Sequence, residues 1–145
     1  MKKIFILGIS LYCAGLFTSC ETLNKFPTNT SGGIFSLNGN WKLTSTTDNN
    51  AEMGTIVTVT PAIASAYVKT LANNNYCYRV NDDAWKSITS LPAGGFNIGY
   101  LAGACNGTTI YKDGQITVLT NSQIRINTKT IGDVNLVQEW TRVTN

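Results

Sequence analysis

The chain has 145 residues, of which 11 are lysine or arginine, 8 are aspartate or glutamate and none is histidine. Nucleic-acid binding needs a clustered basic face, and this near balance of charge does not predict one. Without histidine the chain cannot form a Ser-His-Asp or Cys-His catalytic arrangement, so those nucleophilic mechanisms are excluded.

Residues 1–19 are typical of a secretory signal peptide that ends at a lipoprotein processing site. Lys2 and Lys3 precede an apolar run, residues 4–17, which is too short for a comfortable transmembrane helix. Small residues then lead to Cys20, and this pattern resembles a bacterial lipobox, in which the cysteine after the cleavage site carries diacylglycerol. The alternative is an ordinary signal peptide that is cleaved nearby, with Cys20 incidental. We expect a lipid anchor at Cys20 that holds the chain on a membrane.

Residues 20–36 are predominantly polar and include Pro27, Gly32 and Gly33, a composition that predicts a flexible tether. The tether would hold a folded domain, residues 37–145, away from the bilayer. We expect attachment to the outer membrane of a Gram-negative cell envelope with the domain facing the periplasm. Display at the cell surface is the alternative.

The expected domain contains short runs of alternating or β-branched residues with turn residues between them, which is the pattern of an all-β protein. Residues 63–71 fit both a helical face and a strand face, and we expect a loop with a short strand there. The pair Asp113-Gly114 predicts a hairpin turn, and Asn121-Ser122 predicts a tight bend. The expected strands cover residues 41–46, 55–60, 76–80, 85–89, 96–101, 108–111, 116–120, 123–130 and 134–143.

The two ends of the domain carry a further pattern. Gly39 and Trp41 stand at the first expected strand, and Arg142 stands on the last. This pattern resembles the lipocalin-like (calycin) barrels, and the lipid-anchored chain is similar to lipoproteins of Bacteroidetes-type bacteria. The resemblance implies a small antiparallel up-and-down barrel of eight to ten strands, in which the first and last strands pair and the arginine lies across the tryptophan at the closed end. The alternative with the same strands is a two-sheet β-sandwich.

Cys77 and Cys105 are the two cysteines of the expected domain. An exported compartment is oxidising, so an isolated pair favours a disulfide bond; two buried free thiols are the alternative. A zinc site is not expected, because two thiols without histidine do not make a usual ligand set. We expect no other metal and no cofactor.

Paired carboxylates are the remaining route to acid-base chemistry, and Asp82 and Asp83 are adjacent in the sequence. They follow Asn81 in a turn pattern, so solvated side chains are expected there. The sequence therefore predicts a protein that is not an enzyme.

Two functions fit these features. In the first, a monomeric barrel binds a small hydrophobic or amphipathic ligand, as the resemblance implies, and six aromatic residues toward its open end line the pocket. In the second, the same side chains fill the core, and the domain is an interaction or structural module of the envelope. The size of the internal cavity discriminates between the two. The six aromatic residues are Tyr67, Tyr76, Tyr78, Trp85, Phe96 and Tyr100.

Overall fold

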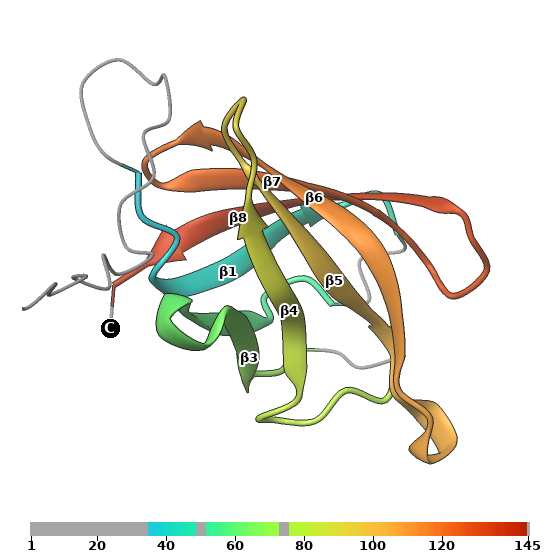
Figure 1. Ribbon diagram of the computed structural model, residues 1–145. Helices are drawn as coiled ribbons and strands as arrows, with labels where there is room; N and C mark the ends of the chain where they lie inside the picture. Colours follow the sequence, from blue (N-terminus) through green and yellow to red (C-terminus); the bar gives the residue numbers. More distant parts are fainter. Residues whose placement is uncertain (1–34, 49–51, 73–75, 145) are drawn as a thin grey trace, which may run out of the picture.

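The computed structural model describes residues 35–48, 52–72 and 76–144. The expected signal peptide, Cys20 and the tether as far as residue 34 lie outside the described residues. Within the described part, the chain forms eight strands and two short 3-10 helices (Figure 1). In chain order these are β1 (Gly39–Thr46), β2 (Ile56–Thr60), η1 (Pro61–Ile63), β3 (Ser65–Thr70), β4 (Asp83–Ser90), β5 (Phe96–Gly103), η2 (Cys105–Gly107), β6 (Ile110–Thr120), β7 (Gln123–Lys129) and β8 (Asn135–Val143).

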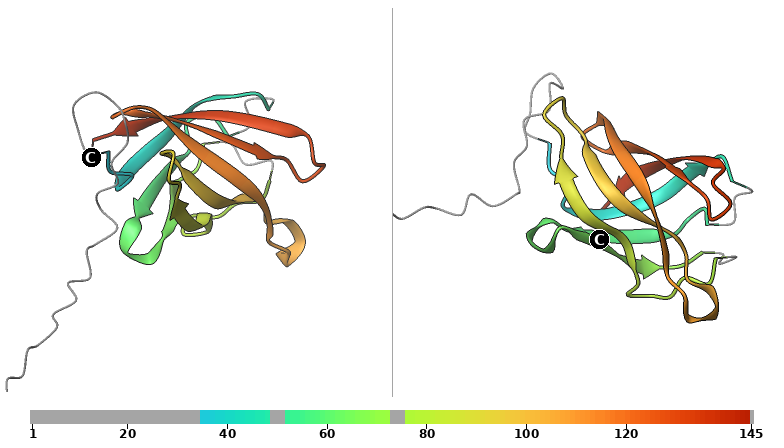
Figure 2. Two further views of the ribbon diagram at one scale, coloured as in Figure 1. Left: turned by 45° about the horizontal axis from the view of Figure 1, so that its top comes forward. Right: turned by 45° about the vertical axis from the view of Figure 1, so that its right-hand side comes forward.

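The eight strands form one sheet that closes on itself, as the views in Figure 2 show. Each strand pairs antiparallel with the next, and β1 pairs with β8 to complete the barrel. In this last ladder Trp41 lies directly opposite Arg142. The expected up-and-down barrel is therefore confirmed, and the β-sandwich alternative is wrong.

Alternation along the strands places apolar side chains inside the barrel. In β7, Ile124, Ile126 and Thr128 are buried, whereas the residues between them are exposed. Rings from strands that are not neighbours meet in the centre, where Trp85 of β4 and Trp140 of β8 form a T-shaped pair with 5.1 Å between ring centres. Side chains from all sides of the barrel therefore share one core.

Arg142 and Trp41 form one end of the barrel, termed here the closed end. The guanidinium carbon of Arg142 lies 4.3 Å from the centre of the Trp41 ring, and Trp41 is fully buried. Arg142 also donates hydrogen bonds to the carbonyl oxygens of Ser36 and Asn38 and, at 3.2 Å, to that of Asn121. The arginine thus joins the segment before β1, the turn after β6 and the last strand.

The folded domain begins before residue 37. Phe35 is buried, and its ring centre lies 6.2 Å from those of Trp41 and Phe96. Leu37 is also buried, and its carbonyl oxygen accepts the indole N–H of Trp41 at 2.8 Å. Phe35 and Ser36, which we expected in the tether, therefore belong to the barrel.

The expected strand at residues 76–80 is wrong. These residues lie in an irregular loop between β3 and β4, in which Cys77 and Asn81 have φ angles of 61° and 74°. A strand needs strongly negative φ angles, so neither residue is compatible with one. The alternation of Tyr78 and Val80 does not mark a common face either, because Tyr78 is buried and Val80 is exposed.

The hairpin turn expected at Asp113-Gly114 is also wrong. β6 runs without a break through these residues and pairs with β5 along this stretch. A Cβ atom on Gly114 would lie 3.1 Å from Cγ1 of Ile98, so the glycine leaves room for this side chain and does not bend the chain. The ambiguous residues 63–71 contain β3, which pairs with β2 and β4.

Candidate functional site in the barrel interior

Four of the six aromatic residues predicted to line a pocket are buried inside the barrel. Three of them extend from β4 and β5 into the core, and the fourth enters from the loop between β3 and β4. None of the four is more than 7% exposed, so all four contribute to the packed interior. The four residues are Tyr78, Trp85, Phe96 and Tyr100.

The other two aromatic residues lie elsewhere. Tyr76 is half-buried, and its ring stacks on that of Tyr78 with 6.0 Å between ring centres. Tyr67 alternates with the buried residues Ala66 and Val68 along β3, which places it on the outer face of the sheet. Tyr67 therefore does not join the other five.

Gln138 is the centre of a hydrogen-bonded network in the interior. It is fully buried on β8, and its amide nitrogen donates to the Tyr100 hydroxyl at 2.9 Å and to Oε2 of Glu52 at 3.1 Å. Its amide oxygen accepts the indole N–H of Trp140 at 3.2 Å. The Tyr100 hydroxyl donates in turn to Oε2 of Glu52 at 3.3 Å. One carboxyl group is therefore held among several neutral donors.

Glu52 belongs to the segment between β1 and β2, and only 6% of it is exposed. Burial raises the pKa of Glu52 above its ordinary value of 4.5, because the charged form loses its hydration. The surrounding phenol and amide groups act in the opposite direction, and the charge of Asp48 adds to the rise. Burial also raises the pKa of Tyr100, so this phenol is a neutral donor at physiological pH.

Neither Gln138 nor Glu52 was predicted from the sequence to belong to the interior. A signal for Gln138 was present, because it stands between the inward residues Leu136 and Trp140 in an alternating strand. Glu52 gave no such signal. It lies outside the strands, where alternation does not apply, and its burial follows from how its segment folds against the barrel end.

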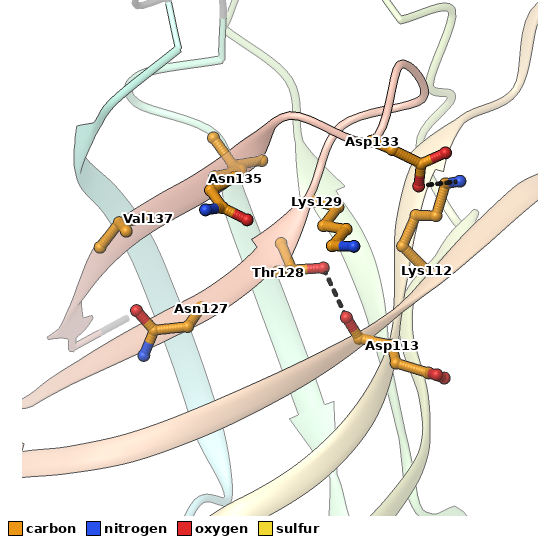
Figure 3. A pocket seen from close by; sticks show the side chains of 9 residues that line it. Lys112, Asp113, Asn127, Thr128, Lys129, Asp133, Asn135 and Val137 are labelled. Atoms are coloured by element: carbon orange, nitrogen blue, oxygen red, sulfur yellow. Dashed lines mark hydrogen bonds and ion pairs between the residues drawn. The ribbon is translucent and has the colours of Figure 1, made fainter.

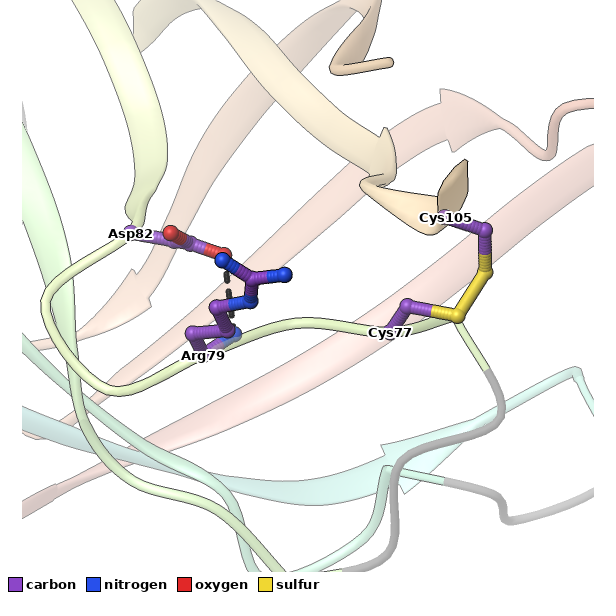
Figure 4. The surroundings of a disulfide bond; sticks show 4 residues. All are labelled: Cys77, Arg79, Asp82 and Cys105. Carbon is purple, nitrogen blue, oxygen red and sulfur yellow. Dashed lines mark hydrogen bonds between the residues drawn. A yellow bond between two sulfur atoms is a disulfide. The ribbon is translucent and has the colours of Figure 1, made fainter. Parts of the chain in front are cut away.

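The end of the barrel opposite the closed end is termed here the mouth; residues 76–82, η2 and the turn between β7 and β8 lie there (Figure 1). A disulfide bond joins Cys77 to Cys105 at the mouth and confirms the predicted pairing (Figure 4). Beside it, the amide of Ala104 donates to the carbonyl oxygen of Tyr76 at 2.9 Å, and the Tyr76 hydroxyl donates to Asp48. The loop at residues 76–82 is thus fastened to the connections on both sides.

Tyr78 fills the space below this loop. Its hydroxyl donates to the carbonyl oxygen of Leu101 at 2.6 Å, in β5. The carboxylates of Asp82 and Asp83 each accept a hydrogen bond from another part of the chain. Asp82 accepts the backbone amide of Arg79 at 2.8 Å in a turn (Figure 4), and Asp83 accepts the Ser65 hydroxyl at 2.7 Å. The two adjacent aspartates therefore bind different groups and do not face each other as an acid-base pair.

Within the described residues, a small cavity of about 20 Å³ lies in the interior. Every residue that lines it is buried. Pockets for small organic ligands measure roughly 300–1,000 Å³, so this cavity is too small for a hydrophobic ligand. Its lining residues are Glu52, Thr55, Val57, Val68, Tyr78, Ala84, Trp85, Tyr100, Leu101 and Trp140.

No family model, curated protein or solved structure matches this chain. In residues 35–48, 52–72 and 76–144, no helix is long and apolar enough to cross a membrane, and no three potential metal-ligating side chains cluster.

Larger concave spaces lie on the outer surface. A trough of about 570 Å³ runs over β6, β7 and β8 beside the ion pair of Lys112 and Asp133, whose atoms are 2.7 Å apart (Figure 3). Within it, the Thr128 hydroxyl donates to the carbonyl oxygen of Asp113 at 2.9 Å. The trough is lined by Lys112, Asp113, Asn127, Thr128, Lys129, Asp133, Asn135, Leu136 and Val137. A second trough, of about 540 Å³, lies over β4, β5 and β6.

Proposed function

We propose that this chain is a lipid-anchored interaction module of a bacterial cell envelope, with a lipocalin-like barrel whose interior is filled. The observation that carries the proposal is the internal cavity of about 20 Å³. A ligand inside the barrel would have to displace core side chains, beginning with Tyr78, which is fastened by its hydroxyl to Leu101. Buried side chains occupy the place that the resemblance assigns to a ligand.

The troughs on the outer surface are large enough to receive part of another molecule. Both troughs are more than twenty times larger than the internal cavity. Charged and amide side chains such as Lys129, Asn127 and Asn135 border the larger one (Figure 3). Such a surface suits reversible, polar contact with another component of the envelope. We therefore place the activity on the outer face of the barrel and assign the chain no catalytic role.

Titration with an environment-sensitive amphipathic dye tests the filled interior. The wild-type protein is expected to show no saturable binding. Tyr78→Ala removes the ring beneath the mouth and measures how the dye responds when the packing of the core is disturbed. Tyr67→Ala removes a tyrosine from the outer face and is the matched negative control. Saturable binding of one dye molecule per wild-type chain would contradict the proposal and favour an internal ligand.

Membrane fractionation tests the anchor separately. Cys20→Ala should move the protein from the membrane fraction to the soluble fraction, because the sulfur that carries the lipid is lost. A variant that stays with the membranes would show that Cys20 is not the attachment site, without bearing on the interior of the barrel.

A further inference from the structure

Two polar atoms in the interior have no hydrogen-bond partner within the described part of the chain: Oε1 of Glu52 and Nε1 of Trp85. Glu52 is 6% exposed, and Trp85 is 0% exposed. The Tyr78 hydroxyl donates to the carbonyl oxygen of Leu101 and also lies beside the Glu52 carboxyl group, whose charged form it favours. A buried polar group without a partner costs about 1–3 kcal/mol, and folded proteins pair nearly all such groups with protein atoms or ordered water.

Both side chains border the same internal cavity. Its volume of about 20 Å³ exceeds the roughly 10–15 Å³ that one water molecule requires, and it does not reach the space of two. Thr55 also lines the cavity; its hydroxyl oxygen accepts the amide of Ala72 at 3.4 Å and keeps a hydrogen to donate. The cavity thus offers one indole donor, one carboxyl oxygen and one hydroxyl group.

We propose that this cavity is a binding site for a single water molecule, which accepts the indole N–H of Trp85 and donates to Oε1 of Glu52. A buried water typically makes two to four hydrogen bonds, and these groups supply that number. The site satisfies both remaining polar atoms at once.

The chemistry of the lining selects water over an ion. A cation would meet the positive end of the Trp85 N–H bond, and it would find one carboxyl group as its only anionic ligand among the lining residues. An anion would meet the carboxyl group of Glu52. Water both donates and accepts, so it fits the carboxyl group in its ionised form and in the protonated form that a raised pKa favours.

The bound water extends the polar network across the core. Glu52 is already connected through Gln138 to Trp140, and the water connects it to Trp85 on β4. The Trp85 and Trp140 rings are also in edge contact with each other. The water, Gln138 and these two rings therefore surround the Glu52 carboxyl group. The segment that carries Glu52 is thereby fixed to both sides of the barrel.

The three tryptophans of this chain allow an internal control. The indole N–H of Trp41 donates to Leu37 and that of Trp140 donates to Gln138, so only the N–H of Trp85 should face water. Nuclear Overhauser and rotating-frame spectra of the ¹⁵N-labelled wild-type protein measure this contact, and the sign of the rotating-frame signal separates contact from proton exchange. A cross-peak between the Trp85 indole proton and a long-lived water is expected, with none for Trp41 or Trp140. Its absence at Trp85 would overturn the proposal.

Filling the cavity gives a second test. Ala84 lines the cavity, whereas Ala102 is a similarly buried alanine outside its lining. In ¹⁷O relaxation dispersion, Ala84→Val should remove one long-lived water molecule per chain, and Ala102→Val should leave the number unchanged. The same number in all three proteins would count against the site. If Ala84→Val does not fold, the wild-type measurement at Trp85 decides alone.

Discussion

Replacing Arg142 by alanine tests whether the closed end holds the barrel together. The guanidinium group donates to the carbonyl oxygens of Ser36, Asn38 and Asn121, and it covers the Trp41 ring. At this half-exposed position each hydrogen bond contributes about 1 kcal/mol, and the cation–π contact contributes about 0.5–1 kcal/mol. The free energy of unfolding should therefore fall by about 3–4 kcal/mol, a large part of the roughly 5–15 kcal/mol that stabilises a typical domain.

Arg125→Ala is the matched control for this variant. Nη2 of Arg125 lies 2.7 Å from Oε1 of Glu139, and both side chains are exposed at 45% and 42%. An ion pair of this kind contributes about 0–1 kcal/mol. Urea unfolding of the oxidised proteins, followed by tryptophan fluorescence, gives both values. Equal losses for Arg142→Ala and Arg125→Ala would refute the role assigned to the closed end.

Three further predictions concern other parts of the barrel. Reduction of the Cys77–Cys105 bond, which joins residues 28 apart, should lower the free energy of unfolding by about 3–4 kcal/mol, and a urea midpoint unaffected by reductant would contradict this. Gly95→Ala should lower the free energy of unfolding by at least about 2 kcal/mol more than Gly94→Ala. Both glycines have positive φ angles, but only at Gly95 would a Cβ atom meet a backbone oxygen, that of Ile116 at 2.3 Å. Equal thermal midpoints for the two variants would contradict this. Burial raises the pKa of Glu52 in the folded state, so the folded protein binds this proton more tightly, and wild-type stability should fall as pH rises from about 4.5 through the raised value. Glu52→Gln should remove this fall, and parallel stability curves for the two proteins from pH 4 to pH 8 would disprove it.

The strand pattern predicted most of the barrel because it reflects burial directly. In β7, inward and outward residues alternate without interruption, and the expected strand at 123–130 agrees with Gln123–Lys129 within one residue. The closed end was predicted on a different basis: the resemblance to lipocalin-like barrels implied that Arg142 lies across Trp41, and the pairing of β1 with β8 places the two residues opposite each other.

The wrong predictions arose where distant contacts override local pattern. Residues 76–80 alternate as a strand would, but Cys77 has a positive φ angle and is bonded to Cys105. Asp113-Gly114 is a common turn sequence, yet here it continues a strand in which the Ile98 side chain of β5 lies over the glycine. The disulfide partner of Cys77 was predicted, but the positive φ angle at Cys77 was not, and the contact between Gly114 and Ile98 is not evident from the residues beside either of them in the sequence.

The size of the cavity was not predictable from the sequence for the same reason. The six aromatic residues could equally have lined a pocket or filled a core, and the outcome depends on what enters from the mouth. Tyr78 comes from a loop and Glu52 from a connection between strands, so strand periodicity gives no information about either. Together with the rings from β4, β5 and β8, they leave an internal space of only about 20 Å³.

Native mass spectrometry of the protein purified from its own host tests the filled interior most directly. The proposed function predicts the mass of the lipidated chain with no small molecule retained, under conditions gentle enough to keep the barrel folded. A small molecule retained in a one-to-one ratio, and lost only on unfolding, would contradict the filled barrel.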